Sequence, residues 1–236
     1  MLSQKPEEWV YEQYAAQYYT FKTLSAENMR FIEDMPGEIR FTEFGKTVAI
    51  RHNDGALLDI ARRHNLTSGR LRNKLEERPE NPRGFIARAE ESMESDPGFS
   101  EYAASFGSDV MITGHSHIQW HACARGKTFI NPGSAGSPLD FDTCAPYTVL
   151  DIGPDGISVT ERRAAYEIED VIARSTGSEM YEAAGFWMDL GFYAMRNARE
   201  IHSIFLRSLK KAAALCGSPN ANEAWKKAVG EWRWDR

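Results

Sequence analysis

The residues best suited to chemistry are two histidines that follow a short apolar run. Residues 109–117 have the sequence DVMITGHSH, so His115 and His117 stand one residue apart directly after Gly114. The run at 110–112 is typical of a short buried strand, and glycine permits the sharp turn after it. Imidazole is the commonest metal ligand in proteins, and a strand end fixes its direction. The pattern therefore predicts that both histidines bind metal.

A third histidine ends another predicted strand. Residues 46–51 predict a short strand in which Val48 and Ile50 point to one side, and His52 follows them directly, ahead of Asn53 and Asp54. If this strand lies next to the first, His52 joins the pair at His115 and His117. Three imidazoles with a carboxylate or an amide can hold a divalent transition metal, and Asn53 and Asp54 are candidate substitute ligands. Such an ion lowers the pKa of bound water and polarises a phosphoryl oxygen.

A local alternative uses only residues close to His115. His115, His117, His121 and Cys123 all stand at odd positions. In an extended strand, such side chains point to the same face. Four nitrogen and sulfur donors in such a short stretch suggest a structural zinc site. An extended strand would separate His115 from Cys123 by roughly 26 Å, however, whereas zinc ligands lie about 2.0–2.3 Å from the ion. We therefore favour the site that includes His52.

A loop rich in glycine, proline and serine follows a hairpin predicted within residues 118–130. Residues 131–138 have the sequence NPGSAGSP. The backbone amides and polar groups of Asn131, Gly133 and Ser134 are candidates for binding phosphate. A surface loop without a ligand explains the same composition equally well.

The composition indicates a soluble globular protein. Of 236 residues, 42% are hydrophobic and 26% charged, and the net charge of −6 argues against general nucleic-acid binding. Three cysteines without a CxxC pair predict a reducing compartment. The charged N-terminus does not resemble a signal peptide, and no apolar stretch is long enough to span a bilayer. We expect a cytoplasmic protein without membrane contact.

Hydrophobic periodicity divides the chain into a body and a helical tail. Residues 8–35 predict helix, with a stripe of aromatic and apolar side chains expected to pack in a core. The many charges of both signs between about residues 55 and 106 indicate a helical insertion of two or three surface helices. We expect His64, which lies in this insertion, to be exposed. We expect a domain at 1–170 and a C-terminal helical extension at 171–236, which is large enough to support a homo-oligomer.

The order of these motifs resembles a known family. A strand ending in GHSH, an earlier strand ending in a histidine and a later strand ending in NPGS are similar to the C-terminal half of the calcineurin-like metallophosphoesterases. The resemblance is closest to their small bacterial phosphodiesterase and phosphatase branch, and it covers about residues 20–170. It implies an α/β (α+β) fold, a partial two-sheet α/β/β/α sandwich with a helical insertion and a long C-terminal helical tail.

The resemblance also implies an activity, hydrolysis of a phosphomono- or phosphodiester by a metal-bound hydroxide. His52 and His115 would bind one ion and His117 another, with His115 and His117 in the catalytic centre and the NPGS loop helping to close it. Manganese, iron, zinc or a similar divalent ion is implied. The family's Asp-x-His, Gly-Asp and Gly-Asn-His motifs are absent, and Asn53 replaces the glycine that normally follows the histidine. The remaining ligands therefore predict less than the full two-ion site.

Three interpretations account for the missing motifs. The chain is the back part of a metallophosphoesterase whose front lies outside this sequence. Alternatively, it is a catalytically degenerate relative that binds partners or oligomerises through its C-terminal helices. The third interpretation is a hydrolase with replacement ligands, for which the nearest spare carboxylates are Asp54, Asp140 and Asp142. In each case the front of the sheet is missing, so we expect an exposed edge strand.

Overall fold

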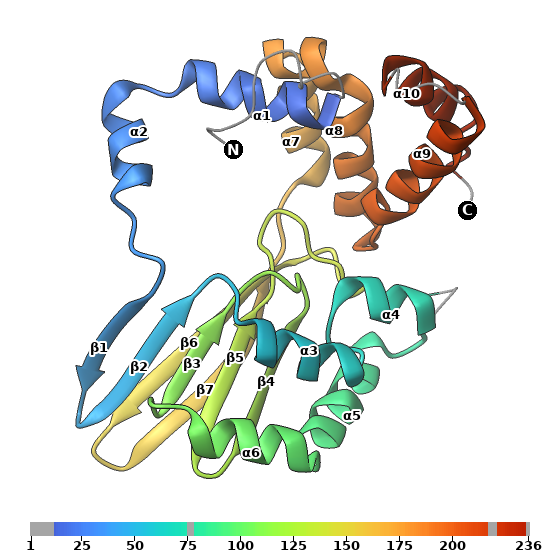
Figure 1. Cartoon of the computed structure of the whole chain (residues 1–236). Helices are drawn as coiled ribbons and strands as arrows, with labels where there is room; N and C mark the ends of the chain where they lie inside the picture. The colour runs from blue at the N-terminus through green and yellow to red at the C-terminus, as the bar shows by residue number, and fades with distance from the viewer. Residues whose placement is uncertain (1–11, 75–77, 217–220, 235–236) are drawn as a thin grey trace. The chain divides into compact units, whose positions relative to one another are not determined.

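The computed structural model describes residues 12–74, 78–216 and 221–234, which fall into two compact units (Figure 1). The sheet unit comprises Pro36–Tyr166 with Ala194–Arg199. The helical unit comprises the described parts of Met1–Met35, Glu167–Tyr193 and Glu200–Arg236. Within the described ranges, no helix combines the length and the apolar character needed to cross a membrane.

The sheet unit holds a five-stranded sheet in the order β1-β2-β3-β5-β4 and a two-stranded sheet of β6 and β7. The bounds are β1 (Ile39–Glu43), β2 (Lys46–Arg51), β3 (Val110–Thr113), β4 (Gln119–Ala124), β5 (Lys127–Pro132), β6 (Ala145–Gly153) and β7 (Gly156–Ala164). Strands β2, β3 and β5 run parallel, and β1 and β4 pair antiparallel at the two edges. This arrangement confirms the predicted mixed α/β fold with a larger and a smaller sheet.

Tight turns explain why two of the hairpins form. Phe44 and Gly45 between β1 and β2 have φ angles of 46° and 71°, and Arg125 and Gly126 between β4 and β5 have 54° and 72°. Left-handed backbone at both central residues is the geometry that matches the twist of paired strands. The hairpin predicted within residues 118–130 is thus confirmed as β4 and β5, and β6 and β7 also pair along their whole length.

Strand β1 is the exposed edge that the sequence predicts. All five of its residues are exposed, including Ile39 and Phe41, which are 51% and 44% accessible to solvent. These two side chains pair with Ile50 and Val48 of β2. Val48 is fully buried, so the apolar face of the sheet continues outward to β1 but is uncovered there.

The larger sheet has helices on one face and the small sheet on the other (Figure 1). On one face it packs against α3 (Gly55–Arg63), α5 (Pro82–Glu94) and α6 (Pro97–Ser105), and Phe99, Phe129 and Trp120 are buried in that core. On the other face Val48, Val110 and Ile130 meet apolar side chains of β6 and β7. The larger sheet is thus the middle layer between helices and the small sheet.

The insertion contains four helices, including α4 (Ser68–Lys74), rather than the two or three that we predict. The extra division arises because Asn81 and Asp96 each cap a helix that has proline in its first turn. Side-chain caps and N-terminal proline both favour a new helix start. The charge pattern used for the prediction does not carry this information.

The prediction that His64 is exposed is wrong. Its side chain is 15% accessible, with Nδ1 3.0 Å from Ser92 Oγ and Nε2 2.9 Å from Asp96 Oδ2. Asp96 also accepts hydrogen bonds from Arg63 at 3.1 Å and from the backbone of Gly98 at 2.8 Å. The carboxylate therefore ties the end of α3 to the start of α6, a tertiary contact that local sequence does not reveal.

An Asp96→Ala variant is expected to lose about 1–3 kcal/mol of unfolding free energy at neutral pH, because a helix cap and the contacts with Arg63 and His64 disappear. Hydrogen bonds from His64 and Arg63 lower the pKa of Asp96 to about 2. The stabilisation is therefore present above the unfolded carboxyl pKa of about 3.9 and is lost as the pH falls toward 2. Urea unfolding across this range should show the difference between parent and variant shrinking.

The matched control is Asp59→Ala, which removes an exposed ion pair with Arg62. We expect it to change the unfolding free energy by less than about 0.5 kcal/mol at any pH in the range. A difference for Asp96→Ala that does not change with pH would contradict the lowered pKa.

The helical unit contains the described helices α1 (Glu12–Thr23), α2 (Ala26–Glu33), α7 (Ile168–Thr176), α8 (Glu179–Asn197, up to Tyr193), α9 (His202–Cys216) and α10 (Ala221–Gly230). Aromatic rings link the C-terminal helices. The ring of Phe186 lies 4.9 Å from that of Phe205 and 6.2 Å from that of Trp225 between centroids. Aromatic side chains therefore pack α8, α9 and α10 against one another.

The helix predicted at residues 8–35 is two helices, and its first residues lie outside the described ranges. Ser25 separates α1 from α2 and caps α2 by accepting a hydrogen bond from the Asn28 N–H at 3.1 Å. The expected core packing is wrong for Phe31 and Ile32, which are 65% and 49% accessible. Helical spacing shows which side chains share a face, but it does not show that another element covers that face.

Candidate metal centre

Two of the three predicted metal ligands come together at the ends of neighbouring strands. Strands β2 and β3 are parallel with Arg51 beside Thr113, so the residues that follow them meet at one edge of the sheet. His52 Nε2 and His115 Nδ1 lie 3.4 Å apart, and the two rings meet edge to face. Both side chains are exposed to solvent.

Gly114 makes this approach of the two imidazoles possible. A Cβ atom at this position would lie 3.2 Å from Nδ1 of His52, tighter than ordinary van der Waals contact. The Gly114 N–H donates to the backbone oxygen of His52 at 3.0 Å, and its carbonyl accepts from Asn131 Nδ2 at 2.6 Å. Hydrogen bonds to the end of β2 and to β5 therefore hold the turn in place.

The histidines after Gly114 have an uncommon backbone geometry. His115 and His117 have φ angles of 69° and 57°, in the left-handed region that residues with a Cβ seldom adopt. Such conformations cost free energy and concentrate at functional sites. Desolvation, together with the imidazoles of His52 and His117, lowers the pKa of His115 and favours its neutral form.

His117 lies beside this pair rather than within it. Its Nδ1 is 3.0 Å from the backbone oxygen of Ser137. Because a carbonyl oxygen only accepts, Nδ1 carries the proton, and Nε2 keeps a lone pair that can bind an ion. The ring nitrogens of His52, His115 and His117 do not all lie within 4.8 Å of one another. Among the described side chains, one other group of three possible ligands does lie within this distance.

The predicted phosphate-binding residues mainly hydrogen-bond within their own loop. Both ends of the Asn131 amide are used, since its Oδ1 accepts from the Gly133 N–H at 3.1 Å while Nδ2 binds Gly114. Ser134 Oγ accepts from the Ser137 N–H at 3.2 Å. Contact of Asn131, Gly133 or Ser134 with a phosphate stays a prediction.

The candidate replacement carboxylates are engaged in other interactions. Asp54 caps α3 through the Leu57 N–H at 2.9 Å, and its second oxygen pairs with Arg51 at 3.2 Å. The Asp140 side chain is fully buried against Arg163. Asn53 and Asp142 are more accessible. Each of the two more enclosed carboxylates would have to leave a partner in order to bind an ion.

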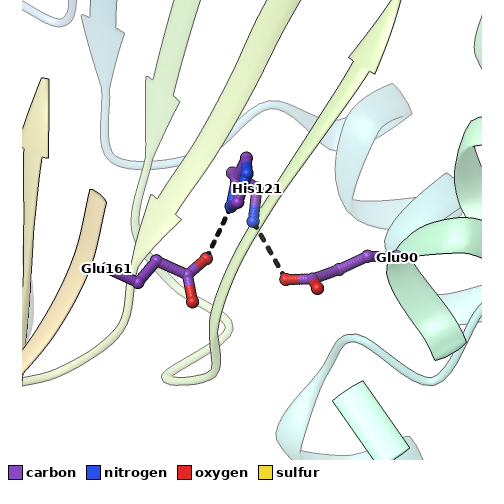
Figure 2. A group of neighbouring side chains, drawn as sticks. All are labelled: Glu90, His121 and Glu161. Atoms are coloured by element: carbon purple, nitrogen blue, oxygen red, sulfur yellow. Dashed lines mark hydrogen bonds and ion pairs between the residues drawn. The ribbon is translucent and has the colours of Figure 1, made fainter. Parts of the chain in front are cut away.

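The local zinc alternative is not formed among the described residues. The side chain of His121 on β4 contacts Glu161 of β7, and the His121 N–H donates to Glu90 of α5 (Figure 2). Sequence reasoning missed this group of three. The partners lie 31 and 40 residues from His121, so no motif or spacing brings them together before the fold is known.

A Gly133→Ala variant is expected to lose about 2–4 kcal/mol of unfolding free energy. Gly133 has a φ of 83°, and an added Cβ would lie 2.7 Å from Cγ of Pro146 and 3.3 Å from Cβ of Gln119. Gly136→Ala in the same loop meets nothing within 4 Å and should change the stability little. Urea unfolding of both variants measures the difference, and equal effects would contradict a steric role for Gly133.

Comparison with known proteins relates the chain to one family. No protein-family model matches the sequence. The chain is 40% identical over 75 residues to the protein named "Probable metallophosphoesterase YsnB" of Bacillus subtilis (strain 168). That alignment spans 31% of this chain and 44% of the Bacillus protein, less than half of its length.

Solved structures of similar proteins include a metallophosphoesterase from Sphaerobacter thermophilus, with 20% identity and a TM-score of 0.46 over 77% of this chain and 65% of that one. A predicted phosphoesterase from Streptococcus pneumoniae TIGR4 has 16% identity and a TM-score of 0.31 over 57% of this chain and 67% of that one. The Bacillus match thus makes the chain similar to a metallophosphoesterase over 31% of its length, in line with the resemblance that its motifs indicate.

Proposed function

We propose that the chain is a metal-dependent phosphoesterase that hydrolyses a phosphomono- or phosphodiester. The supporting observation is the 3.4 Å separation between His52 Nε2 and His115 Nδ1. Two nitrogens bound to one tetrahedral ion at about 2.0–2.1 Å are about 3.3 Å apart. The family relationship supplies the reaction class, and this spacing fits the metal that such a reaction uses.

The donor chemistry also fits a divalent ion. Imidazole nitrogens suit zinc, iron and similar metals, and the lowered pKa of His115 favours the neutral form that binds them. We assign His52 and His115 to one ion, while Nε2 of His117 is available to a second ion or to a phosphoryl oxygen. A bound ion of this kind lowers the pKa of water and polarises a phosphoryl oxygen.

The substrate would enter beside the loop after β5. His117 joins this loop through its contact with the Ser137 carbonyl, so the loop borders the imidazole that we assign to the phosphoryl group. Gly114 contributes by its lack of a side chain, because a Cβ there would push against His52. With the other family motifs absent from the sequence, we propose fewer ligands than a full two-ion centre has.

The test is the metal content of the purified chain together with its hydrolysis of bis-p-nitrophenyl phosphate in the presence of Mn²⁺. We expect at least one bound ion per chain, turnover that stops with a chelator and recovery when Mn²⁺ is restored. Comparison with p-nitrophenyl phosphate separates diester from monoester activity. A chain that binds no metal and turns over neither ester would contradict the proposal and favour the degenerate binding or oligomerisation protein.

A further inference from the structure

Two carboxylates and an imidazole meet at the outer side of β4, away from the histidines assigned above. Glu90 comes from α5, His121 from β4 and Glu161 from β7, and each offers a donor atom within 4.8 Å of the other two (Figure 2). Nδ1 of His121 is already 2.8 Å from Oε1 of Glu161. Because three separate elements supply the donors, the fold itself fixes their spacing.

Burial makes this group of charges costly without a cation. The side chains of Glu90 and Glu161 are only 11% and 10% accessible. Oε2 of Glu161 is shielded from solvent, and its partner is the Arg83 guanidinium, with which it forms an ion pair. Nη2 of Arg83 is also 3.1 Å from Glu90. The guanidinium is thus shared between two enclosed carboxylates, and the second oxygen of Glu161 pairs with His121.

We propose that Glu90, His121 and Glu161 bind a divalent transition-metal ion such as Zn²⁺, and that Arg83 occupies the place of this ion until it is displaced. Two carboxylate oxygens and one imidazole nitrogen are a ligand set for which a fourth position stays open. Two ligands of one tetrahedral ion are about 3.3 Å apart, so donor atoms that lie within 4.8 Å of one another need to close by at most about 1.5 Å.

Arg83 can leave without disrupting the core. Its side chain is 47% accessible, and it lines a cavity of about 400 Å³ that Glu161 also borders. This cavity provides a path to solvent from which an ion can reach the carboxylates. A divalent ion would supply both positive charges that match the two carboxylates, a role that Arg83 otherwise shares with a protonated His121.

A purely structural role explains only part of this arrangement. Glu90 accepts the backbone N–H of His121 at 3.2 Å, and Glu94, one helical turn later, accepts that of Cys123 at 2.7 Å. Both glutamates thereby protect the edge of β4, which requires neither Glu161 nor the imidazole of His121. Glu94 is thus a matched control on the same helix.

The experiment uses a variant in which the proposed phosphoesterase site is removed by His52→Ala, His115→Ala and His117→Ala. Isothermal titration calorimetry of this triple variant, which lacks the three histidines, is expected to show one Zn²⁺ ion bound per chain. Since this background has no ligands at the first site, the result is independent of the proposed phosphoesterase activity. Absence of Zn²⁺ binding would overturn the inference.

Single changes in that background identify the ligands. Glu161→Gln and His121→Gln should each weaken Zn²⁺ binding by at least about tenfold, whereas Glu94→Gln should leave it unchanged. Arg83→Gln should strengthen it, because the competing cation is gone. Zn²⁺ binding that survives Glu161→Gln, or that falls with Arg83→Gln, would overturn the inference.

A measurement on the unmutated chain decides the matter if any of these variants fails to fold. The side-chain ¹⁵N resonances of His121 report directly on metal coordination at the ring. We expect them to shift when Zn²⁺ is added in excess of the ions bound at the first site. Resonances that stay unchanged at saturating Zn²⁺ would overturn the inference.

Discussion

An Asp140→Ala variant is expected to lose about 3–5 kcal/mol of unfolding free energy, because it leaves the Arg163 guanidinium enclosed without its counter-ion. The Asp140 side chain is fully buried, and Arg163 is 18% accessible. Two guanidinium nitrogens donate to the two carboxylate oxygens at 3.1 and 2.6 Å. Oδ2 also accepts the Gln119 N–H at 3.1 Å, so the carboxylate links a loop to β4 and β7.

Urea unfolding followed by circular dichroism measures this loss. The control is Asp142→Ala, since Asp142 is 47% accessible and its carboxylate is 3.8 Å from the same arginine. We expect the control to lose less than about 1 kcal/mol. Replacing both members of the buried pair with apolar residues of similar volume should recover part of the stability, because no unpaired charge then remains. Equal losses for Asp140→Ala and Asp142→Ala would contradict this account.

Loss of either histidine after Gly114 should have the largest effect on turnover. His115→Ala removes one of the two nitrogens that lie 3.4 Å apart and are assigned to the ion. Loss of a residue that only supports a metal ligand lowers metal affinity by about 10–100-fold, so loss of the ligand itself should lower it by more. His117→Ala removes the imidazole assigned to a second ion or to the phosphoryl oxygen. We expect a decrease in Mn²⁺-dependent hydrolysis of about 10²–10⁴-fold, with metal bound by His52 and His115 retained.

Parallel measurement of metal content and hydrolysis separates these two roles. His202→Ala on α9 is the matched control, because this histidine packs its ring against Trp187 in the helical unit, 4.7 Å between centroids. It should leave both metal binding and turnover unchanged. Hydrolysis that persists in His117→Ala at the parent rate would remove this residue from the proposed site.

Local patterns predict the scaffold of the candidate site well. The apolar run before Gly114 predicts β3, and the apolar residues at 48–50 before His52 predict β2, because short apolar runs bounded by turn residues are typical of buried strands. Parallel pairing of these strands then brings His52 to His115. Nothing local predicts that His117 points to Ser137 instead of joining them, since that depends on a loop whose path is set by tertiary contacts.

Charged groups are predicted least well. His64 has the sequence surroundings of an exposed residue, yet Asp96 draws it into a contact between helices. Likewise Glu90 and Glu161 come close to His121 only because the fold places α5 and β7 beside β4. Polar side chains bury according to their partners rather than any hydrophobic period, so their environment follows from the complete fold.

The two edges of the larger sheet differ in how they can associate. At the β4 edge, carboxylates of Glu90 and Glu94 already hold the N–H groups of His121 and Cys123. At the β1 edge, no strand within the described ranges covers the outer side. Head-to-tail stacking of β1 on β4 from chain to chain would have to displace these carboxylates, which disfavours the open filament that such stacking builds. Pairing of β1 with β1 about a twofold axis uses up both free edges, so growth stops at two copies.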